Sequence, residues 1–385
     1  MITPPLTIGI EEEYMIIDPE TRALASYVTP MLAQGQAVFG HHVKAEFMQS
    51  QIEIAGPVCT DLAHAREELI RLRKAMSQVA GQNGKRIAAA ATHPFSSWRD
   101  QTISPGERYA DLYSDMQDVA RRLVIFGMHV HLGFGTSSEA RALTIDIMNQ
   151  MRYFLPHILA LSTSSPFWHA RETGLKSYRT VVFESLPRTG IPPTFDSYDD
   201  YERMIGLFAK VGSLGKDVSV ENPSRIWWDI RPNPRVGTLE VRVADICTTV
   251  DEAMCITALI QCVAAMLIKL RQTNQSWRLY RSELLHENKW RAARYGIDGH
   301  LVDFGREEAV PVPALWREII GLFEGVIDGL GARRDIDYVE TILKHGTSAD
   351  RQLATFHKAI QAGHSQETAM VQVMDQVLAE TVQES

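Results

Sequence analysis

The sequence predicts an α+β protein in which a sheet carries unusual polar residues and is flanked by helices. Three observations predict this class. Strand-like and helix-like stretches are interleaved through residue 270. Several of the strand-like stretches contain ionisable residues. From about residue 282 the pattern is mostly helical, apart from a turn-rich stretch at 296–313.

Apolar residues that alternate or run continuously predict the strands, and apolar residues at helical spacing predict the helices. Leu62, Leu69 and Met76, for example, share one face of a helix that Gly81 is expected to end. The expected strands lie at 7–17, 86–93 and 124–134, with a hairpin over 225–245 that turns at 232–234. The expected helices lie at 61–80, at 108–123, at 137–156 and after residue 197.

The uncharged run Ala253–Ile268 is expected to be a buried core helix. Thr249 and Glu252 precede it with the spacing of a capping box, which marks the start of a helix. The run is shorter than the roughly 20 apolar residues that a helix needs to span a bilayer. No membrane association is therefore expected.

Composition and charge exclude other classes. The 385 residues include 39 Lys and Arg against 47 Asp and Glu, a net charge of −8, and no basic stripe of the kind that binds nucleic acid. The 4 cysteines have neither disulfide-motif nor zinc-ligand spacing, so we expect free thiols in a reducing cytoplasm. Met1–Pro5 lacks the basic residues of a secretory signal.

The strand at 7–17 carries three consecutive glutamates. Period-two alternation puts Glu11 and Glu13 on one face and Glu12 on the other. Two carboxylates side by side on a sheet face repel each other unless a cation lies between them. A metal site and a solvent-exposed strand face both explain this pattern.

The strand at 124–134 carries His129 and His131 on one face, between apolar residues that share the other face. One such histidine would be typical of a satisfied core or surface residue. Two of them, flanked by Gly127 and Gly133, favour contact with a metal or a phosphate, because glycine lets a ligand approach the strand closely.

The expected hairpin at 225–245 carries acids and arginines. Arg225, Asp229 and Arg231 share a face of its first strand, and Glu240 and Arg242 share a face of its second. Cross-strand pairing on a wet sheet explains these charges. A phosphoryl-transfer site explains them as well, because an acid there holds metal while guanidinium groups hold phosphate oxygens.

Glu46 and Glu53 form a fourth pair. Their odd separation places them on opposite faces of a straight strand, so a turn or bulge must lie between them if both serve one site. The chain has no P-loop, no dinucleotide-binding glycine motif and no G-x-S-x-G elbow. Carboxylates on sheet faces favour Mg²⁺ or Mn²⁺ over zinc.

The order of these motifs resembles the type 2 glutamate–cysteine ligase, or carboxylate–amine ligase, family of the glutamine synthetase superfamily. The resemblance runs from about residue 6 to residue 296. Its motifs are Gly-Ile-Glu-x-Glu at 9–13, Glu-x₆-Glu at 46–53, Gly-Met-His-x-His at 127–131, Phe-Glu-Ser-Leu-Pro at 183–187, the block at 221–245 and Glu-Asn-Lys-Trp-Arg at 287–291. Each motif is short, but their order makes the match specific.

The resemblance implies a curved, largely antiparallel sheet forming an active-site funnel, in a single catalytic domain over 1–385. ATP would enter one end and the amino-acid substrate the other, with two or three Mg²⁺ between them. One metal site would consist of Glu13, Glu46 and Glu53. The second would consist of Glu11, His129 and Glu240.

The resemblance also implies roles for the basic residues. Arg242, Arg231 and Arg225 would bind the phosphates of ATP or the acyl phosphate, and His131 would lie near those phosphates. Lys289 and Arg291 are weaker candidates, because basic residues in a helical tail are usually solvated. A carboxylate would attack the γ-phosphate of ATP, and an amine would then displace phosphate from the acyl phosphate to form an amide.

Other functions remain open at this point. A ligase or phosphotransferase of the same superfamily could act on a different substrate. A metal-dependent hydrolase could be built from His129, His131 and the carboxylates, although the arginines would then be unexplained. A binding protein without turnover is a third alternative. The family resemblance also suggests a homodimer acting on small molecules.

Overall fold

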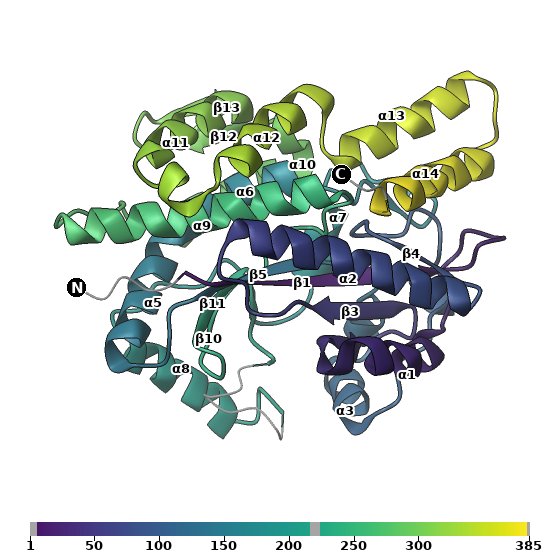
Figure 1. The fold of residues 1–385 in the computed structure, drawn as a ribbon, viewed down its shortest axis with the longest axis horizontal. Coiled ribbons are helices and arrows are strands. Elements are labelled where there is room, and N and C mark those ends of the chain that lie inside the picture. The colour runs from purple at the N-terminus through teal and green to yellow at the C-terminus, as the bar shows by residue number, and fades with distance from the viewer. Residues whose placement is uncertain (1–5, 216–223, 383–385) are drawn as a thin grey trace.

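The computed structural model describes residues 6–215 and 224–382, so Met1–Pro5 and the first three residues of the 221–245 block lie outside the described residues. A seven-stranded sheet has the order β10-β11-β5-β1-β3-β2, with β4 also paired to β1 (Figure 1). Its strands are β1 (Ile8–Ile17), β2 (Val43–Ala45), β3 (Gln51–Ala55), β4 (Arg86–Ala88), β5 (Met128–Gly133), β10 (Ile230–Asn233) and β11 (Thr238–Val241). Three two-stranded pairs join β6 (Phe167–Trp168) to β7 (Arg171–Glu172), β8 (Thr189–Gly190) to β9 (Trp227–Trp228) and β12 (His300–Asp303) to β13 (Glu308–Pro311).

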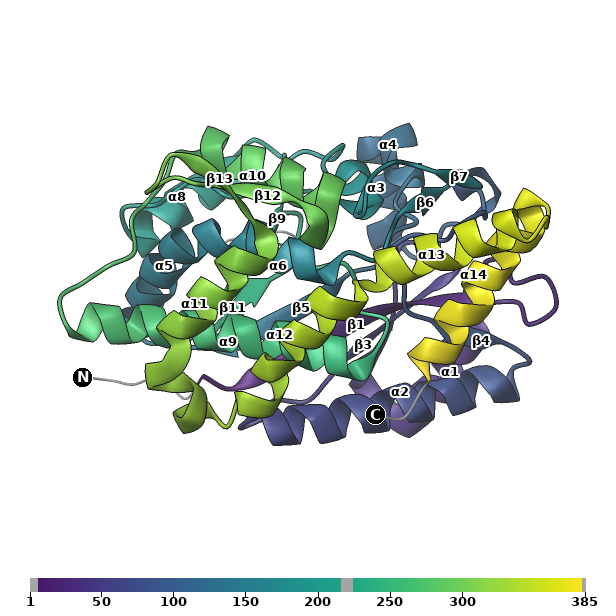
Figure 2. The same ribbon diagram turned by 90° about the horizontal axis from the view of Figure 1, so that it is seen from above.

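Helices surround the sheet, as the predicted α+β class requires (Figures 1 and 2). They are α1 (Val28–Phe39), α2 (Leu62–Gln82), α3 (Glu107–Met116), α4 (Asp118–Arg121), α5 (Ser138–Met151), α6 (Leu155–Ser162), α7 (Tyr178–Phe183), α8 (Tyr198–Lys210), α9 (Val250–Gln272), α10 (Ser282–Tyr295), α11 (Val312–Ile327), α12 (Arg333–His345), α13 (Ser348–Gln361) and α14 (Gln366–Thr381). The pairings of the large sheet are antiparallel. The sheet stays open and does not curl, so it cannot enclose a funnel by itself.

The large sheet has an apolar face and a polar face. On the apolar face Ile10, Val130 and Leu239 belong to one core cluster with the residues of α9. Helices α2 and α9 run along this face (Figures 1 and 2). Because successive strand residues point to opposite faces, the ionisable side chains of β1, β5 and β11 project from the other face.

Helix α9 is the buried core helix that its sequence predicts. The Thr249 hydroxyl accepts a hydrogen bond from the Glu252 N–H, and the Glu252 carboxylate accepts one from the Thr249 N–H. The helix is long and apolar enough to cross a membrane, but 83% of its most apolar window is buried inside the protein. The apolar side chains of α9 are thus covered by the rest of the protein.

Glu12 points away from Glu11 and Glu13, as the alternation predicts, and it is buried between β1 and α2. Arg73 of α2 donates from Nε to a Glu12 oxygen at 2.9 Å and contacts the second oxygen as well. The same guanidinium donates to the carbonyls of Thr248 at 2.7 Å and Cys247 at 2.9 Å. Glu12 therefore anchors β1 to α2 and to the chain before α9.

We expect Glu12→Gln to lower the free energy of unfolding by about 3 kcal/mol, because it leaves the buried Arg73 charge without its counter-ion. Urea unfolding, monitored by circular dichroism, measures this loss of unfolding free energy. Glu68→Gln, which removes the partner of the exposed Arg71 on α2, is the matched control and should change stability by less than about 1 kcal/mol. Equal stability of Glu12→Gln and the wild type would contradict a structural role for this pair.

Several expected elements have different ends in the structure. The helix expected at 108–123 breaks at Gln117, whose φ of 50° lies in the left-handed region, and becomes α3 and α4. The strands expected at 86–93 and 124–134 are reduced to β4 and β5. The helix expected at 137–156 ends at Met151, and a short 3₁₀ segment leads into α6.

The first strand of the expected hairpin is also interrupted. Asp229 donates its backbone N–H to Gly190 at 2.9 Å, while its carbonyl accepts the N–H of Arg242 at 2.7 Å. β9 therefore pairs in parallel with β8, and only β10 forms the hairpin with β11. Beyond residue 282 the chain is mostly helical as expected, and the turn-rich stretch at 296–313 contains the hairpin of β12 and β13.

Candidate active site

The ionisable side chains of the polar face come together because their strands are neighbours. Glu11 of β1 lies opposite His129 of β5, and Glu240 of β11 lies opposite His131. On the other side of β1, Glu13 lies opposite Glu53 of β3. Glu11 and His129, which are 118 residues apart in sequence, are therefore direct cross-strand neighbours.

Glu13, Glu46 and Glu53 form the first cluster, with one oxygen of each within 4.8 Å of the others. Glu46 directly follows β2, and a turn leads the chain back into β3, which carries Glu53. The turn that their odd separation requires is therefore present. Burial raises the pKa of Glu13, and burial together with the Glu53 and Glu13 carboxylates raises that of Glu46 well above its ordinary value.

Glu11, His129 and Glu240 form the second cluster, again with one donor atom of each within 4.8 Å of the others. Burial and the nearby Arg242 charge lower the pKa of His129 to about 4, so its imidazole is neutral at pH 7. Burial opposes ionisation of Glu11, but hydrogen bonds with His129 and His131 outweigh it and hold the pKa of Glu11 well below its ordinary value.

Two arginines hold the Glu240 carboxylate. Arg231 donates from Nε at 2.9 Å and from Nη2 at 3.2 Å, and Arg242 contacts the same carboxylate. Burial would raise the pKa of Glu240, but the charges of Arg231 and Arg242 keep it well below the ordinary value. The arginines thus stand next to the second cluster.

The structure does not place Arg225, Asp229 and Arg231 along one strand, because the expected strand is interrupted. Arg225 precedes β9, and its guanidinium forms an ion pair with Asp115 of α3. Asp229 is buried and accepts a hydrogen bond from Lys289 at 2.6 Å. The expectation that these three side chains share one face of a single strand is therefore wrong, because Asp229 bonds to α10 while Arg225 lines the smaller cavity.

His131 lies on the polar face between two strands. Its Nδ1 is 2.9 Å from the Thr238 hydroxyl, and its Nε2 is 3.6 Å from a Glu11 oxygen. Burial lowers the tendency of His131 to carry a proton, but the Glu240 and Glu11 carboxylates outweigh burial and raise its pKa. It therefore lies beside the second cluster as a cationic or hydrogen-bonding group.

Lys289 and Arg291 differ in their surroundings. Lys289 is buried and bonds to both Asp229 and Glu184, at 2.6 and 2.7 Å, so the expectation that it is solvated is wrong. Burial alone would lower the pKa of Lys289, but the charges of the Asp229 and Glu184 carboxylates outweigh burial and raise it. Arg291 is partly exposed and pairs with Glu287 on its own helix.

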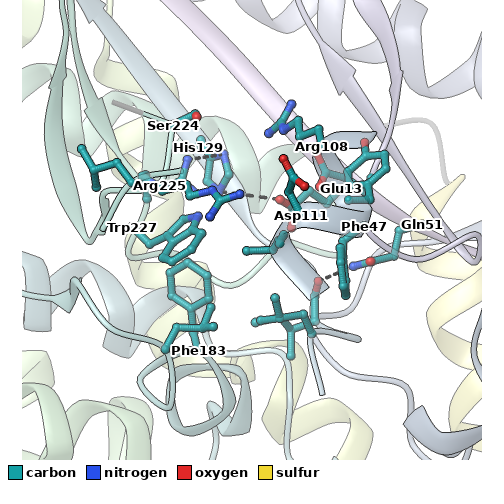
Figure 3. A pocket seen from close by; sticks show the side chains of 18 of the residues that line it. Glu13, Phe47, Gln51, Arg108, Asp111, His129, Phe183, Ser224, Arg225 and Trp227 are labelled. Carbon is teal, nitrogen blue, oxygen red and sulfur yellow. Dashed lines mark hydrogen bonds and ion pairs between the residues drawn. The ribbon is translucent and has the colours of Figure 1, made fainter. Parts of the chain in front are cut away.

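Two adjoining cavities lie over the polar face. The smaller has a volume of about 280 Å³ and the larger about 590 Å³, and Glu13, Glu46, His129 and Arg242 line both. Figure 3 shows the smaller cavity, with Trp227 and Phe183 on one side and Phe47 on the other. Helix α3 supplies part of its wall, so helices and loops complete the enclosure that the open sheet cannot form.

Some residues of these cavities carry no motif in the sequence. Arg179 is 4% exposed, lines the smaller cavity, and its Nε has no hydrogen-bond partner among the described residues. Gly127 makes room for it, because a Cβ there would lie 2.5 Å from an Arg179 nitrogen. Arg108 of α3 and Lys44 of β2 line the larger cavity. Lys44, two residues before Glu46, could have been found from the alternation of β2.

The chemistry of both clusters fits a hard divalent cation. Their donors are carboxylate oxygens and one neutral imidazole, which are ligands that Mg²⁺ and Mn²⁺ accept. The raised pKa values of Glu13 and Glu46 show that negative charge is unfavourable in the first cluster unless a cation balances it.

The sequence matches the family described as glutamate-cysteine ligase family 2 over residues 7–373. A protein of Herpetosiphon aurantiacus, provisionally named glutamate–cysteine ligase 2, is 49% identical over 98% of this chain and 94% of its own length. A protein of Rhodospirillum rubrum with the same provisional name is 46% identical over 99% of this chain and 97% of its own length.

Solved structures share the fold at much lower identity. The crystal structure of glutamate–cysteine ligase from Francisella tularensis in complex with AMP has a TM-score of 0.68 and 13% identity, covering 98% of this chain and 89% of that one. A bifunctional glutathione synthetase from Pasteurella multocida has a TM-score of 0.67 and 14% identity, covering 97% of this chain and 52% of that one.

Proposed function

The chain belongs to glutamate–cysteine ligase family 2, which makes it an ATP-dependent ligase of the glutamate–cysteine ligase type, and we propose that it joins glutamate to cysteine through an acyl phosphate. One observation carries this proposal. Two clusters of metal-binding donors share one sheet face with Arg231 and Arg242, beside two adjoining cavities. Activation of a carboxylate by ATP needs this combination of cation and guanidinium groups.

Each cluster would hold one Mg²⁺ or Mn²⁺, the first through Glu13, Glu46 and Glu53 and the second through Glu11, His129 and Glu240. Bound cations would neutralise phosphate charge and orient the phosphates. His129 suits this role because its low pKa keeps a nitrogen lone pair available at neutral pH. His131 would lie near the phosphates as a hydrogen-bond donor.

The arginines would bind the anionic oxygens of the reaction. Arg242 is the strongest candidate, because it lines both cavities and its buried Nε has no hydrogen-bond partner among the described residues. Arg231 would assist it from β10. Arg225 would act from the smaller cavity, where Asp115 orients its guanidinium.

The reaction would proceed in two steps. The carboxylate of glutamate attacks the γ-phosphorus of ATP, ADP leaves, and an acyl phosphate forms. The amine of cysteine then attacks the acyl carbon, inorganic phosphate leaves, and an amide bond forms. In the smaller cavity the unpartnered Nε–H of Arg179 would be available to a substrate carboxylate.

We further propose that residues 1–385 act as one catalytic domain in the cytoplasm, as a homodimer. Four free, buried cysteines suit a reducing compartment. Helices α11 and α12 pack on the core helix α9, and α14 packs on β4, which ties the C-terminal part to the sheet. Light scattering after size-exclusion chromatography tests the dimer.

The reaction is tested by measuring ADP release with Mg²⁺, glutamate and a panel of amines, with mass spectrometry of the products. We expect cysteine to stimulate ADP release and an amide to appear in proportion to ADP. A phosphotransferase would give a stable phosphorylated product without an amine, and a hydrolase would give no ADP in this assay. If another amino acid stimulates ADP release, only the substrate name changes. If none does, the proposal that the enzyme joins glutamate to an amine is wrong.

A further inference from the structure

Lys44 lies between the two carboxylate clusters. It stands opposite Glu53 in the pairing of β2 with β3, and Glu53 stands opposite Glu13 in the pairing of β3 with β1. Lys44, Glu53 and Glu13 therefore form one row across three strands on the polar face. The Lys44 Nζ is 2.8 Å from a Glu53 oxygen and 3.8 Å from a Glu11 oxygen.

This ammonium group touches one carboxylate of each cluster, since Glu53 belongs to the first and Glu11 to the second. Its side chain is nevertheless 50% exposed and lines the larger cavity. Because half of the Lys44 side chain is exposed, its ammonium group can turn into the larger cavity without a loss of packing. Arg242 and Arg231, by contrast, are about 10% exposed and held in place around Glu240.

We propose that Lys44 is a built-in counter-ion that competes with a divalent cation for Glu53 and Glu11 and moves into the larger cavity when the cation binds. This inference rests on the proposed metal clusters and adds a residue that sets their affinity. A cation coordinated by Glu53 would lie within a few ångströms of Nζ, and charges of the same sign at that distance repel strongly in a partly buried site.

If Lys44 competes with the cation, removing the Lys44 charge should strengthen Mg²⁺ binding, whereas most changes in a binding site weaken it. Lys44→Met keeps the length of the side chain and removes its charge. We expect Mg²⁺ to bind the full-length Lys44→Met protein about tenfold more tightly than the wild type in isothermal titration calorimetry without nucleotide, at low salt. Lys44→Arg keeps the charge and should bind Mg²⁺ like the wild type.

Lys85→Met is the matched control. Lys85 pairs with Asp18 at 3.1 Å, away from both clusters, so its loss should leave Mg²⁺ affinity unchanged. A second readout follows the side chain itself. Amine labelling of the wild type, followed by mass spectrometry, should become severalfold faster at Lys44 when Mg²⁺ is added, while labelling of Lys85 stays constant.

Equal or weaker Mg²⁺ binding by Lys44→Met would overturn the inference and leave the proposed ligase reaction untouched. If neither Mg²⁺ nor Mn²⁺ binds the wild-type protein, the metal clusters and the inference fall together, and the ADP assay then decides the reaction separately. Should Lys44→Met not fold, Lys44→Gln carries the same expectation for affinity and for the control.

Discussion

Replacement of Glu46 by glutamine is expected to weaken Mg²⁺ binding and to lower the rate of ATP turnover about 1,000-fold, on the order of 4 kcal/mol. Glutamine keeps the shape of the side chain but removes the charge that a hard cation requires of its ligand. The stability of the metal-free protein should stay the same or increase. Burial and the neighbouring carboxylates of Glu53 and Glu13 already raise the pKa of Glu46, so its charge opposes folding.

The opposite directions of these two effects separate a metal ligand from a structural residue. Titration calorimetry measures Mg²⁺ affinity, ADP release measures turnover, and thermal unfolding in the presence of a chelator measures stability. Glu340→Gln is the control, because Glu340 pairs with Arg317 in an exposed position. A Glu46→Gln protein that binds Mg²⁺ normally, or that loses stability in proportion to activity, would contradict the assignment of Glu46.

Arg242→Ala is expected to lower kcat about 1,000-fold, because the variant loses a charged, partly unpartnered group that faces both cavities. The kcat of Arg242→Lys should lie between those of the wild type and Arg242→Ala, with a 10- to 100-fold loss (about 1.4–3 kcal/mol) relative to the wild type. Lysine restores the charge but not the planar fork that can hold two oxygens at once. Glu240 keeps Arg231 as a partner in both variants, so the fold should survive.

Steady-state kinetics with saturating Mg²⁺ and separate titrations of ATP and amino acid give kcat and the two KM values. Arg291→Ala is the matched control, since Arg291 pairs with Glu287 on the surface of α10 and should leave both parameters unchanged. Unchanged kinetics in Arg242→Ala would make Arg242 a structural partner of Glu240. A large drop in the melting temperature of Arg242→Ala together with the drop in rate would also indicate a structural role for Arg242.

The polar strands could be predicted from the sequence because alternation along a strand is a local property. Glu11 and Glu13 share a face whatever lies beside β1, and so do His129 and His131 within β5. Helix α9 was equally predictable, because its capping box and apolar run lie within the helix itself. These local patterns also carried the resemblance to the family.

The ends of several elements could not be predicted, because long-range contacts determine them. Asp229 interrupts a strand since its backbone bonds to Gly190 and Arg242 and its side chain bonds to Lys289. None of these partners is near it in sequence. Without them, the alternation of 225–231 indicates one continuous strand, and Asp229 is then placed on the same strand face as Arg225 and Arg231.

The residues that the sequence analysis missed are those whose importance depends on their neighbours. Arg179 looks like an ordinary helix residue until α7 places it against Gly127 beside the smaller cavity. Lys44 looks like a surface lysine until β2 places it opposite Glu53. Alternation puts Lys44 on the face of Glu46, but only the folded structure shows which carboxylates and cavities Lys44 and Arg179 meet.

Local patterns in the chain were enough to predict the α+β class, the core helix α9 and the faces on which the glutamates and histidines of each strand lie, because the periods of helix and strand act over a few residues. Which strands are neighbours follows from the three-dimensional fold, and so do the two clusters, the arginines around Glu240 and the position of Lys44. Strand pairing joins segments that are far apart in the chain. Burial and the charges of the neighbouring side chains then shift the pKa of each ionisable group. The electrostatics of this site is therefore a property of the folded sheet.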